Sequence, residues 1–263
     1  VVEVVCDGCD DPDTAGSYVQ SQCAFKGFAY QGQIPDVYPC FLRGQDWRIY
    51  QTGCGWEVQQ LELMDSECLQ GANRNSRFIL EVGRDGLSLR DKTQPQMQPL
   101  QLDAPGMRRR FSGRDLLARS IGRRCRSVID ATAGFGRDSF HLFYLGKCVI
   151  AIERSPVVAV MLADAIDRFV PSARSDSFQL ICDDARQRFT RCDPPDVIFL
   201  DPMFPDRQGR SALAGKELQI LRTLVGDDED AGSLLQVAQS IALQRVVVKR
   251  PAWAGPLGSV PDL

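Results

Sequence analysis

Five short apolar segments, each ending in charged residues, constrain the fold of this chain more than any other feature. They are Val128-Ile129, Cys148 to Ile152, Gln179 to Cys182, Val197 to Leu200 and Val246 to Val248. Helical patterns separate them, such as the one from Ser155-Pro156 to about Val170. Apolar strands that alternate with helices are typical of a parallel sheet covered on both faces, which binds ligands at the carboxyl ends of its strands. We therefore predict a Rossmann-like α/β fold.

The residues before this pattern predict a smaller N-terminal domain of short strands. Gly, Pro and Asp separate short mixed segments at Phe25–Tyr30, Trp47–Tyr50 and Trp56–Leu63. Two apolar runs, 78–82 and 87–89, flank Asp85-Gly86, which is a common hairpin turn. Residues 92–106 are rich in Gln and Pro and lack periodicity, so they indicate a connector. We divide the chain into an accessory domain with its connector, 1–105, and a second domain, 106–263.

A glycine turn follows the first apolar segment. Asp130 ends the segment, and Gly134 and Gly136 let the backbone turn tightly against a ligand. Asp138 and Ser139 are candidate N-caps of the helix that follows. Such turns are also common in proteins without a cofactor, so the turn alone leaves a purely structural role open. Together with the acid that ends the next segment, it predicts a loop that binds a nucleotide-like cofactor.

That acid is Glu153, which lies 23 residues beyond Asp130. A carboxylate at the end of the second strand of a βαβ unit can accept both ribose hydroxyls. A dinucleotide loop has a third glycine where this chain has Ser139, so that the helix N-terminus can approach a pyrophosphate. Asp138 would repel a pyrophosphate but suits a sulfonium and an amino group. We therefore favour S-adenosylmethionine as cofactor and disfavour a nicotinamide-dependent oxidoreductase.

Acids also end the third and fourth segments. Asp183-Asp184 can accept a hydrogen bond from the adenine amino group or cap a helix, and both roles stay open. The fourth segment ends in Asp201-Pro202-Met203-Phe204. A purine amine is a weak nucleophile, so an enzyme that methylates it must hold its N–H groups with fixed acceptors. Asp201 and the Pro202 carbonyl can be those acceptors, and Phe204 can stack on the base.

Guanine fits this motif better than adenine. Guanine presents two adjacent donors, N1–H and the N2 amine, to one carboxylate, whereas adenine pairs a donor with an acceptor. We therefore predict that Asp201, Pro202 and Phe204 are catalytic, while adenine N6 stays the alternative target. A proline-rich turn that merely closes a strand is the structural alternative.

A local basic cluster suggests contact with phosphate. The net charge of −3 argues against nucleic-acid binding by bulk charge, but eight arginines lie between Met107 and Arg126 against the single acid Asp115. They are Arg108, Arg109, Arg110, Arg114, Arg119, Arg123, Arg124 and Arg126. We expect the cluster on the side of the sheet that carries its ligand loops. A solvated helix face is the alternative. The predicted RNA-binding residues are Arg108, Arg109, Arg110, Lys249 and Arg250.

The other residues of note predict neither a metal site nor a membrane segment. Cys6-Asp7-Gly8-Cys9 has the spacing of a zinc knuckle, but a second such pair is missing and His141 is the only histidine of the chain. Reduced thiols of a cytoplasmic protein are therefore the expectation for the ten cysteines. No apolar run approaches the roughly 18 residues that span a bilayer.

Several of these motifs together resemble the bacterial 16S rRNA guanine-N2 methyltransferase family (RsmJ), over about residues 105–258. They are Asp130-Ala131-Thr132-Ala133-Gly134-Phe135-Gly136-Arg137-Asp138, Glu153-Arg154, Leu200-Asp201-Pro202-Met203-Phe204-Pro205 and Arg245-Val246-Val247-Val248-Lys249-Arg250-Pro251. The resemblance implies a class I methyltransferase sheet and transfer of a methyl group from S-adenosylmethionine to guanine N2 in small-subunit rRNA. The glycine turn and the resemblance together predict the residues that bind the cofactor. They are Asp130, Gly134, Gly136, Arg137, Asp138, Glu153, Arg154, Asp183, Asp184 and Asp201.

The partners implied are 16S rRNA or the small ribosomal subunit. A methyltransferase for another nucleic-acid amine is the alternative among enzymes. From a different class of protein, an inactive RNA-binding assembly factor would keep the fold without binding the cofactor.

Overall fold

The computed structural model describes residues 2–6, 38–42, 45–52, 55–60, 77–83, 86–104, 115–203, 215–226, 228–251 and 257–258. It divides into two compact units. Unit 1 comprises residues 1–103 together with 160–168, and unit 2 comprises 104–159 and 169–263. Among the described residues, no helix has the length and apolar character needed to cross a membrane.

Unit 1 contains two small sheets, in agreement with the prediction of short strands. In the first, β2 (Tyr38–Leu42), β3 (Gln45–Thr52) and β4 (Gly55–Gln60) pair antiparallel. The second has the order β1-β5-β6-β7. Its strands are β1 (Val2–Cys6), β5 (Phe78–Gly83), β6 (Gly86–Asp91) and β7 (Leu100–Gln101). The predicted hairpin is β5–β6, and β7 is a short strand inside the segment predicted as a connector.

A buried ion pair anchors the hairpin of unit 1. Asp164 is 1% exposed and accepts from Arg168, whose Nη2 also donates to the Leu102 carbonyl at 3.1 Å. Gly86 lies against this pair with φ of 109°. A Cβ atom there would lie 2.6 Å from Arg168 Nε, so this position requires glycine for both its backbone and its space.

Unit 2 is built on a five-stranded parallel sheet of order β10-β9-β8-β11-β12. Its strands are β8 (Ser127–Asp130), β9 (Cys148–Glu153), β10 (Phe178–Cys182), β11 (Val197–Leu200) and β12 (Arg245–Val248). All four pairings are parallel, so every carboxyl end lies at one edge of the sheet. The predicted strands are confirmed to within one residue at each end, because each apolar run is itself a strand.

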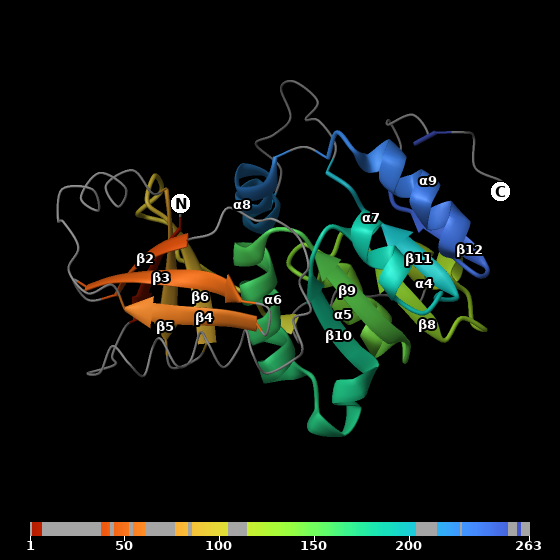
Figure 1. Ribbon diagram of the computed structural model, residues 1–263, viewed down its shortest axis with the longest axis horizontal. Helices are drawn as coiled ribbons and strands as arrows, with labels where there is room; N and C mark the ends of the chain where they lie inside the picture. The colour runs from red at the N-terminus through yellow and green to blue at the C-terminus, as the bar shows by residue number, and fades with distance from the viewer. Residues whose placement is uncertain are drawn as a thin grey trace. The chain divides into compact units, whose positions relative to one another are not determined.

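Helices cover both faces of this sheet (Figure 1). The described elements outside the strands are α4 (Leu116–Ile121), α5 (Arg137–Tyr144), α6 (Pro156–Phe169), η1 (Ser172–Ser177), α7 (Ala185–Arg188), η2 (Phe189–Arg191), α8 (Lys216–Val225) and α9 (Ala231–Ile241). One face packs Ile129, Ile152 and Ile198 against residues of α7, η2 and α9. On the other face, Phe140 of α5 lies edge-on to Phe178 of β10, with ring centroids 5.1 Å apart.

The helix after the glycine turn begins earlier than predicted. Gly136 is the N-cap of α5, with a left-handed φ of 79°, and Asp138 lies in the first turn. The prediction of Asp138 or Ser139 as N-cap is therefore wrong. The reason is that Gly136 adopts the left-handed backbone conformation itself, so the chain enters the helix at Arg137 without a side-chain cap.

Candidate active site

Two clefts adjoin at the carboxyl edge of the parallel sheet. One has a volume of about 620 Å³ and is lined by the ends of β9 and β10 together with residues of α8 and α9. The other, of about 1260 Å³, is lined by the glycine turn, the end of β12 and residues of α8. We call them the β9–β10 cleft and the β12 cleft. Both contain Thr132, Gly134, Asp201, Met203 and Leu221.

Hydrogen bonds to the buried side chain of Asp130 hold the glycine turn in place. This side chain is 1% exposed and accepts from Ser139 Oγ at 2.5 Å and from the Thr132 N–H at 3.3 Å. Burial raises its pKa to about 7. Gly134 stands at the top of the turn with φ of 54°. Asp130 therefore fixes the shape of the turn, while the backbone around Gly134 forms the surface shared by both clefts.

Glu153 ties the glycine turn to the start of α6. Its Oε2 accepts from the Gly134 N–H at 2.8 Å, and its Oε1 accepts from the Ser155 N–H at 2.7 Å. Burial raises the pKa of Glu153 to about 7. A carboxylate has about four acceptor positions, so these two bonds leave capacity for a further donor. Glu153 lines the β9–β10 cleft, where the sequence predicts a ribose.

The two acids after β10 have different roles. Asp184 caps α7 by accepting from the Arg186 N–H at 2.9 Å, and its hydrogen bonds with the Arg186 side chain lower its pKa. Asp183 is 2% exposed, and its Oδ1 accepts from the Asp184 N–H at 2.7 Å. Its Oδ2 is buried and has no hydrogen-bond partner within the described part of the chain. Burial raises the pKa of Asp183. Because Oδ2 has no partner, the cleft contains a buried acceptor that no described residue uses.

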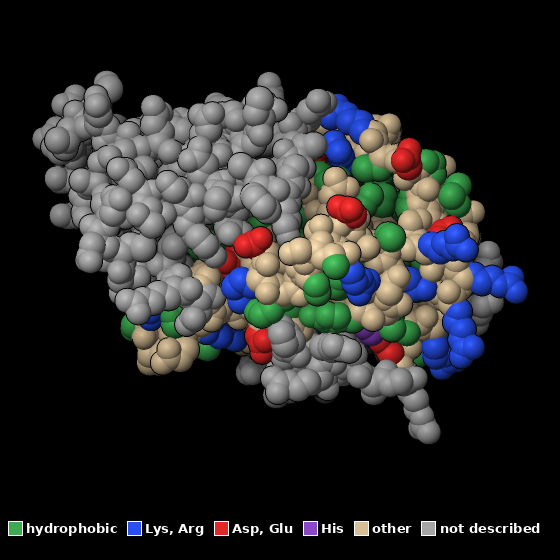
Figure 2. Space-filling view, turned by 90° about the horizontal axis from the view of Figure 1, so that it is seen from below, with side chains coloured by type: hydrophobic (Ala, Val, Ile, Leu, Met, Phe, Trp, Pro, Cys, Tyr) green, Lys and Arg blue, Asp and Glu red, His purple; other side chains and the backbone are tan. Residues whose placement is uncertain are grey.

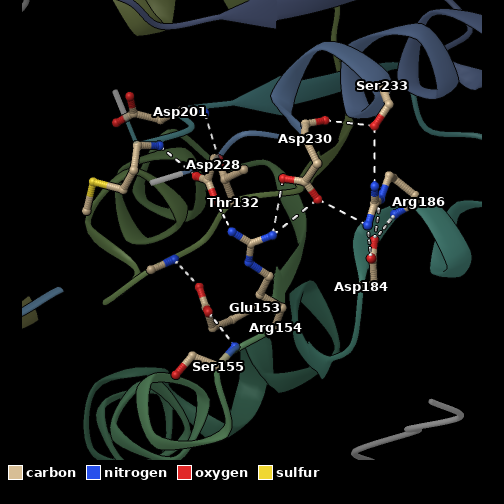
Figure 3. A network of polar contacts seen from close by, with 12 residues as sticks. Thr132, Glu153, Arg154, Ser155, Asp184, Arg186, Asp201, Asp228, Asp230 and Ser233 are labelled. Carbon is tan, nitrogen blue, oxygen red and sulfur yellow. Dashed lines mark hydrogen bonds and ion pairs between the residues drawn. The ribbon is translucent and has the colours of Figure 1, made fainter. Parts of the chain in front are cut away.

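A polar network crosses the β9–β10 cleft (Figure 3). Arg154 forms ion pairs with Asp228 and Asp230, which precede α9. Arg186 pairs with Asp230 at 3.1 Å. The sequence-based prediction missed Asp228, Asp230 and Arg186 as site residues, although the acidic run from Asp227 to Asp230 was a visible signal.

One member of the network reaches the loop that follows β11. Asp228 Oδ2 accepts from the Met203 N–H at 2.6 Å, and the Asp228 N–H donates to the Met203 carbonyl at 3.4 Å. Asp228 therefore joins Arg154, at the end of β9, to the loop that contains Asp201. The guanidinium group of Arg154, predicted to contact the cofactor, donates to carboxylates of this network.

Asp201 stands where the two clefts meet, beside a lysine. Lys249 Nζ lies 2.6 Å from Asp201 Oδ2 and 2.6 Å from Asp138 Oδ2. Thr132 Oγ1 accepts from the Asp201 N–H at 2.6 Å. Burial raises the pKa of Asp201. Burial by itself lowers the pKa of Lys249, but the two carboxylates outweigh it and raise that pKa, so the lysine stays protonated.

The structure brings most of the predicted residues together. Arg137, Asp138, Pro202, Lys249 and Arg250 line the β12 cleft. Phe204, Arg108, Arg109, Arg110 and Cys9 lie outside the described residues.

The basic cluster does not lie as a whole on the expected side of the sheet. Arg126 directly precedes β8, and its carbonyl accepts from the Cys148 N–H at the start of β9. Arg123 and Arg124 lie in the turn before it. These arginines are therefore at the amino edge, opposite the clefts, and the expectation is wrong for them. The reason is that residues entering a parallel strand lie one strand length from those leaving it.

Comparisons with known proteins agree with this architecture. A family model described as "Putative SAM-dependent methyltransferase" matches residues 62–262. Ribosomal RNA small subunit methyltransferase J of Thioalkalivibrio sulfidiphilus is 42% identical over 205 residues, covering 72% of this chain and 80% of that protein. The protein of the same name from Shewanella amazonensis is 34% identical over 239 residues, covering 85% of this chain and 91% of that protein.

A solved structure has the same fold. The SAM-dependent methyltransferase of Neisseria gonorrhoeae matches with a TM-score of 0.62 and 24% identity, over 99% of this chain and 90% of that chain. At this level of identity the likeness concerns the fold alone.

Proposed function

We propose that this chain methylates the N2 amine of a guanine in small-subunit rRNA, because it belongs to the ribosomal RNA small subunit methyltransferase J family. The chain is an S-adenosylmethionine-dependent methyltransferase with a Rossmann-like α/β fold. The predictions of family, fold class and cofactor are therefore confirmed.

The residues of the β9–β10 cleft suit the adenosyl part of this cofactor. Asp183 Oδ2 is a buried acceptor without a partner among the described residues, and an adenine amino group is a donor that would satisfy it. Glu153, one strand away, has acceptor capacity for ribose hydroxyls. Asp138 and Asp201 supply negative charge near the glycine turn, which suits a sulfonium and an amino group. When bound, the cofactor supplies an electrophilic methyl group.

One observation carries the proposed chemistry: Asp201 lines both clefts. Its carboxylate therefore faces both the β9–β10 cleft, which suits the cofactor, and the β12 cleft, through which a base would enter. Lys249 and the bond to Thr132 fix its position, and the lysine favours its ionised form. An ionised Asp201 accepts N–H from the target amine, so it aims the nitrogen lone pair and stabilises the positive charge that the nitrogen gains during transfer. The methylated amine then loses one proton.

The preference for guanine rests on the donors of the base. One carboxylate can accept both N1–H and N2–H of guanine, and the Pro202 carbonyl can accept a remaining N–H. The base must leave its stack to reach a cleft of this kind. Phe204 is proposed to stack on it. From the β12 cleft, Arg137 is proposed to bind the cofactor and Arg250 the RNA, whereas Lys249 supports Asp201.

Methyl transfer from labelled S-adenosylmethionine to small-subunit rRNA, followed by mass spectrometry of the nucleosides, tests the proposal. We expect label in N2-methylguanosine. Label in N6-methyladenosine would favour the adenine alternative. Absence of any label in rRNA or in assembled subunits, for a chain that binds the cofactor, would contradict the proposed substrate.

A further inference from the structure

A second basic surface lies at the amino edge of the parallel sheet, away from both clefts. It consists of five exposed arginines from the end of α4, the turn before β8 and the start of β12: Arg119, Arg123, Arg124, Arg126 and Arg245. Figure 2 views the molecule from below and shows Lys and Arg side chains gathered at its right-hand end. This is the end at which Figure 1 labels α4 and β12. We call this group the amino-edge surface.

Hydrogen bonds hold the backbone beneath these arginines in place. Asp196 accepts from the Arg126 N–H at 2.6 Å, from the Ser127 N–H at 3.1 Å and from Gln244 Nε2 at 2.8 Å. Lys147 Nζ donates to the carbonyls of Gly122 and Cys125, at 3.2 and 2.7 Å. The turn before β8 is thus fixed to neighbouring elements, and its guanidinium groups extend from a rigid frame.

The amino-edge surface carries an excess of positive charge. Within the part of the chain that the structure describes, no ion pair joins any of its five arginines to a carboxylate. Two acids lie in the segment before β11, Asp193 and Asp196. Backbone N–H bonds from Arg126 and Ser127, and to a smaller degree the charge of Arg126, lower the pKa of Asp196, so the five arginines still outnumber the two acids. Arginine binds phosphate through two parallel N–H groups, so five of them on a fixed frame match the spaced phosphates of a nucleic-acid backbone.

We propose that the amino-edge surface binds the phosphate backbone of the substrate RNA at a point remote from the target base. The inference rests on the proposed function, since the partner is the same RNA. The four residues of β8 separate the two edges by about 13 Å, at roughly 3.3 Å per residue, before any loop is counted. A phosphate at the amino edge therefore belongs to a nucleotide a few positions away from the one in the clefts. Only an RNA long enough to reach both edges benefits.

The test compares two triple variants at positions 123, 124 and 126. Arg123→Gln, Arg124→Gln and Arg126→Gln together remove the charge, whereas Arg→Lys at the same positions keeps it. Binding to small-subunit rRNA is measured by fluorescence anisotropy over a range of salt concentrations. For the Gln variant we expect affinity to fall by on the order of tenfold and the salt slope to decrease by about 0.7 to 0.9 for each phosphate that the protein no longer neutralises. The Lys variant should keep the slope.

A dinucleotide that contains guanine serves as the second substrate. The Gln variant should bind it as the unaltered protein does, because it cannot reach both edges. Unchanged binding of long rRNA by the Gln variant would overturn the proposal, as would an equal loss on both RNAs. Thermal unfolding and cofactor affinity confirm that the variants are folded. Because the readout is binding, a failure to methylate rRNA would count against the proposed function alone.

Discussion

We predict that loss of Asp228 slows methyl transfer, because its bond to the Met203 N–H holds the loop that contains Asp201. Asp228→Ala removes a charged acceptor 2.6 Å from the Met203 N–H, and with it a link between the Asp201 loop and Arg154. Hydrogen bonds to charged groups contribute about 1.5–3 kcal/mol. At about 1.4 kcal/mol per tenfold, kcat should fall by roughly 10- to 100-fold, because the loop no longer holds Asp201 in one position.

Asp230 offers a matched control. It pairs with Arg154 and Arg186 in the same network, yet no bond joins it to Met203 among the described residues. The side chains of these arginines are 42% and 35% exposed, and ion pairs of this kind contribute about 1 kcal/mol or less. Asp230→Ala should therefore change kcat by about fivefold at most. Asp228→Asn keeps an acceptor for the Met203 N–H and should fall between the two.

The measurement is kcat and KM for methyl transfer to small-subunit rRNA, with cofactor affinity determined by titration calorimetry. The expected loss is in kcat, and the KM for RNA should change little. Equal effects of Asp228→Ala and Asp230→Ala would refute the reasoning, because the network would then act only through its charge. Thermal unfolding of each variant excludes a loss of fold as the cause.

Three further predictions concern the acids that end the strands. Asp201→Ala should lower the methyl-transfer rate by about 10²-fold with little change in RNA affinity, as measured by single-turnover kinetics and anisotropy; full activity would remove Asp201 from the chemistry. Asp183→Ala should weaken cofactor binding in calorimetry by about 1.5–3 kcal/mol, whereas Asp184→Ala should chiefly destabilise α7; equal affinities for the two variants would contradict the assignment of Asp183 to adenine. Asp130→Asn should become more stable relative to the unaltered protein as pH rises from about 4 to 7, by up to about 1.4 kcal/mol per pH unit in urea unfolding. The sign follows because the folded protein, with a pKa of about 7 at Asp130, retains a proton in this range that the unfolded chain has lost; a constant difference would show that Asp130 titrates normally.

The strands of the second domain could be predicted from the sequence because each is a short apolar run bounded by polar residues. Strands that are buried on both faces show no alternation of apolar and polar residues, and the runs predicted at 148–152 and 197–200 agree with the structure to within a residue. The order of strands in the sheet could not be predicted in this way, since periodicity contains no information on which strands pair. The sequence also could not predict that residues 160–168 of α6 belong to unit 1, because this depends on tertiary contacts.

The site was predictable to the same degree. Glu153, Asp183 and Asp201 could be placed at the ligand edge from the sequence, because a residue that ends a parallel strand must lie there, whatever the rest of the chain does. Their partners were not found. Arg154 and Asp228 are 74 residues apart, and no local pattern connects them. The arginine cluster shows the opposite error: residues close in sequence were treated as one surface, although part of the cluster enters the sheet at the amino edge.

Lys249 shows how such a partner changes the interpretation of a site. As a basic residue after the last strand it suggested contact with RNA, yet its ammonium group lies between Asp138 and Asp201. The three groups together carry one net negative charge, so the site attracts a single positive charge such as a sulfonium. At the same time the lysine opposes the burial that raises the pKa of Asp201, and so it favours a carboxylate that accepts from the target amine over a carboxylic acid that would donate to it. A contact between Lys249 and an RNA phosphate would draw the ammonium away and weaken both effects, which makes support of Asp201 its more consistent role in this structure.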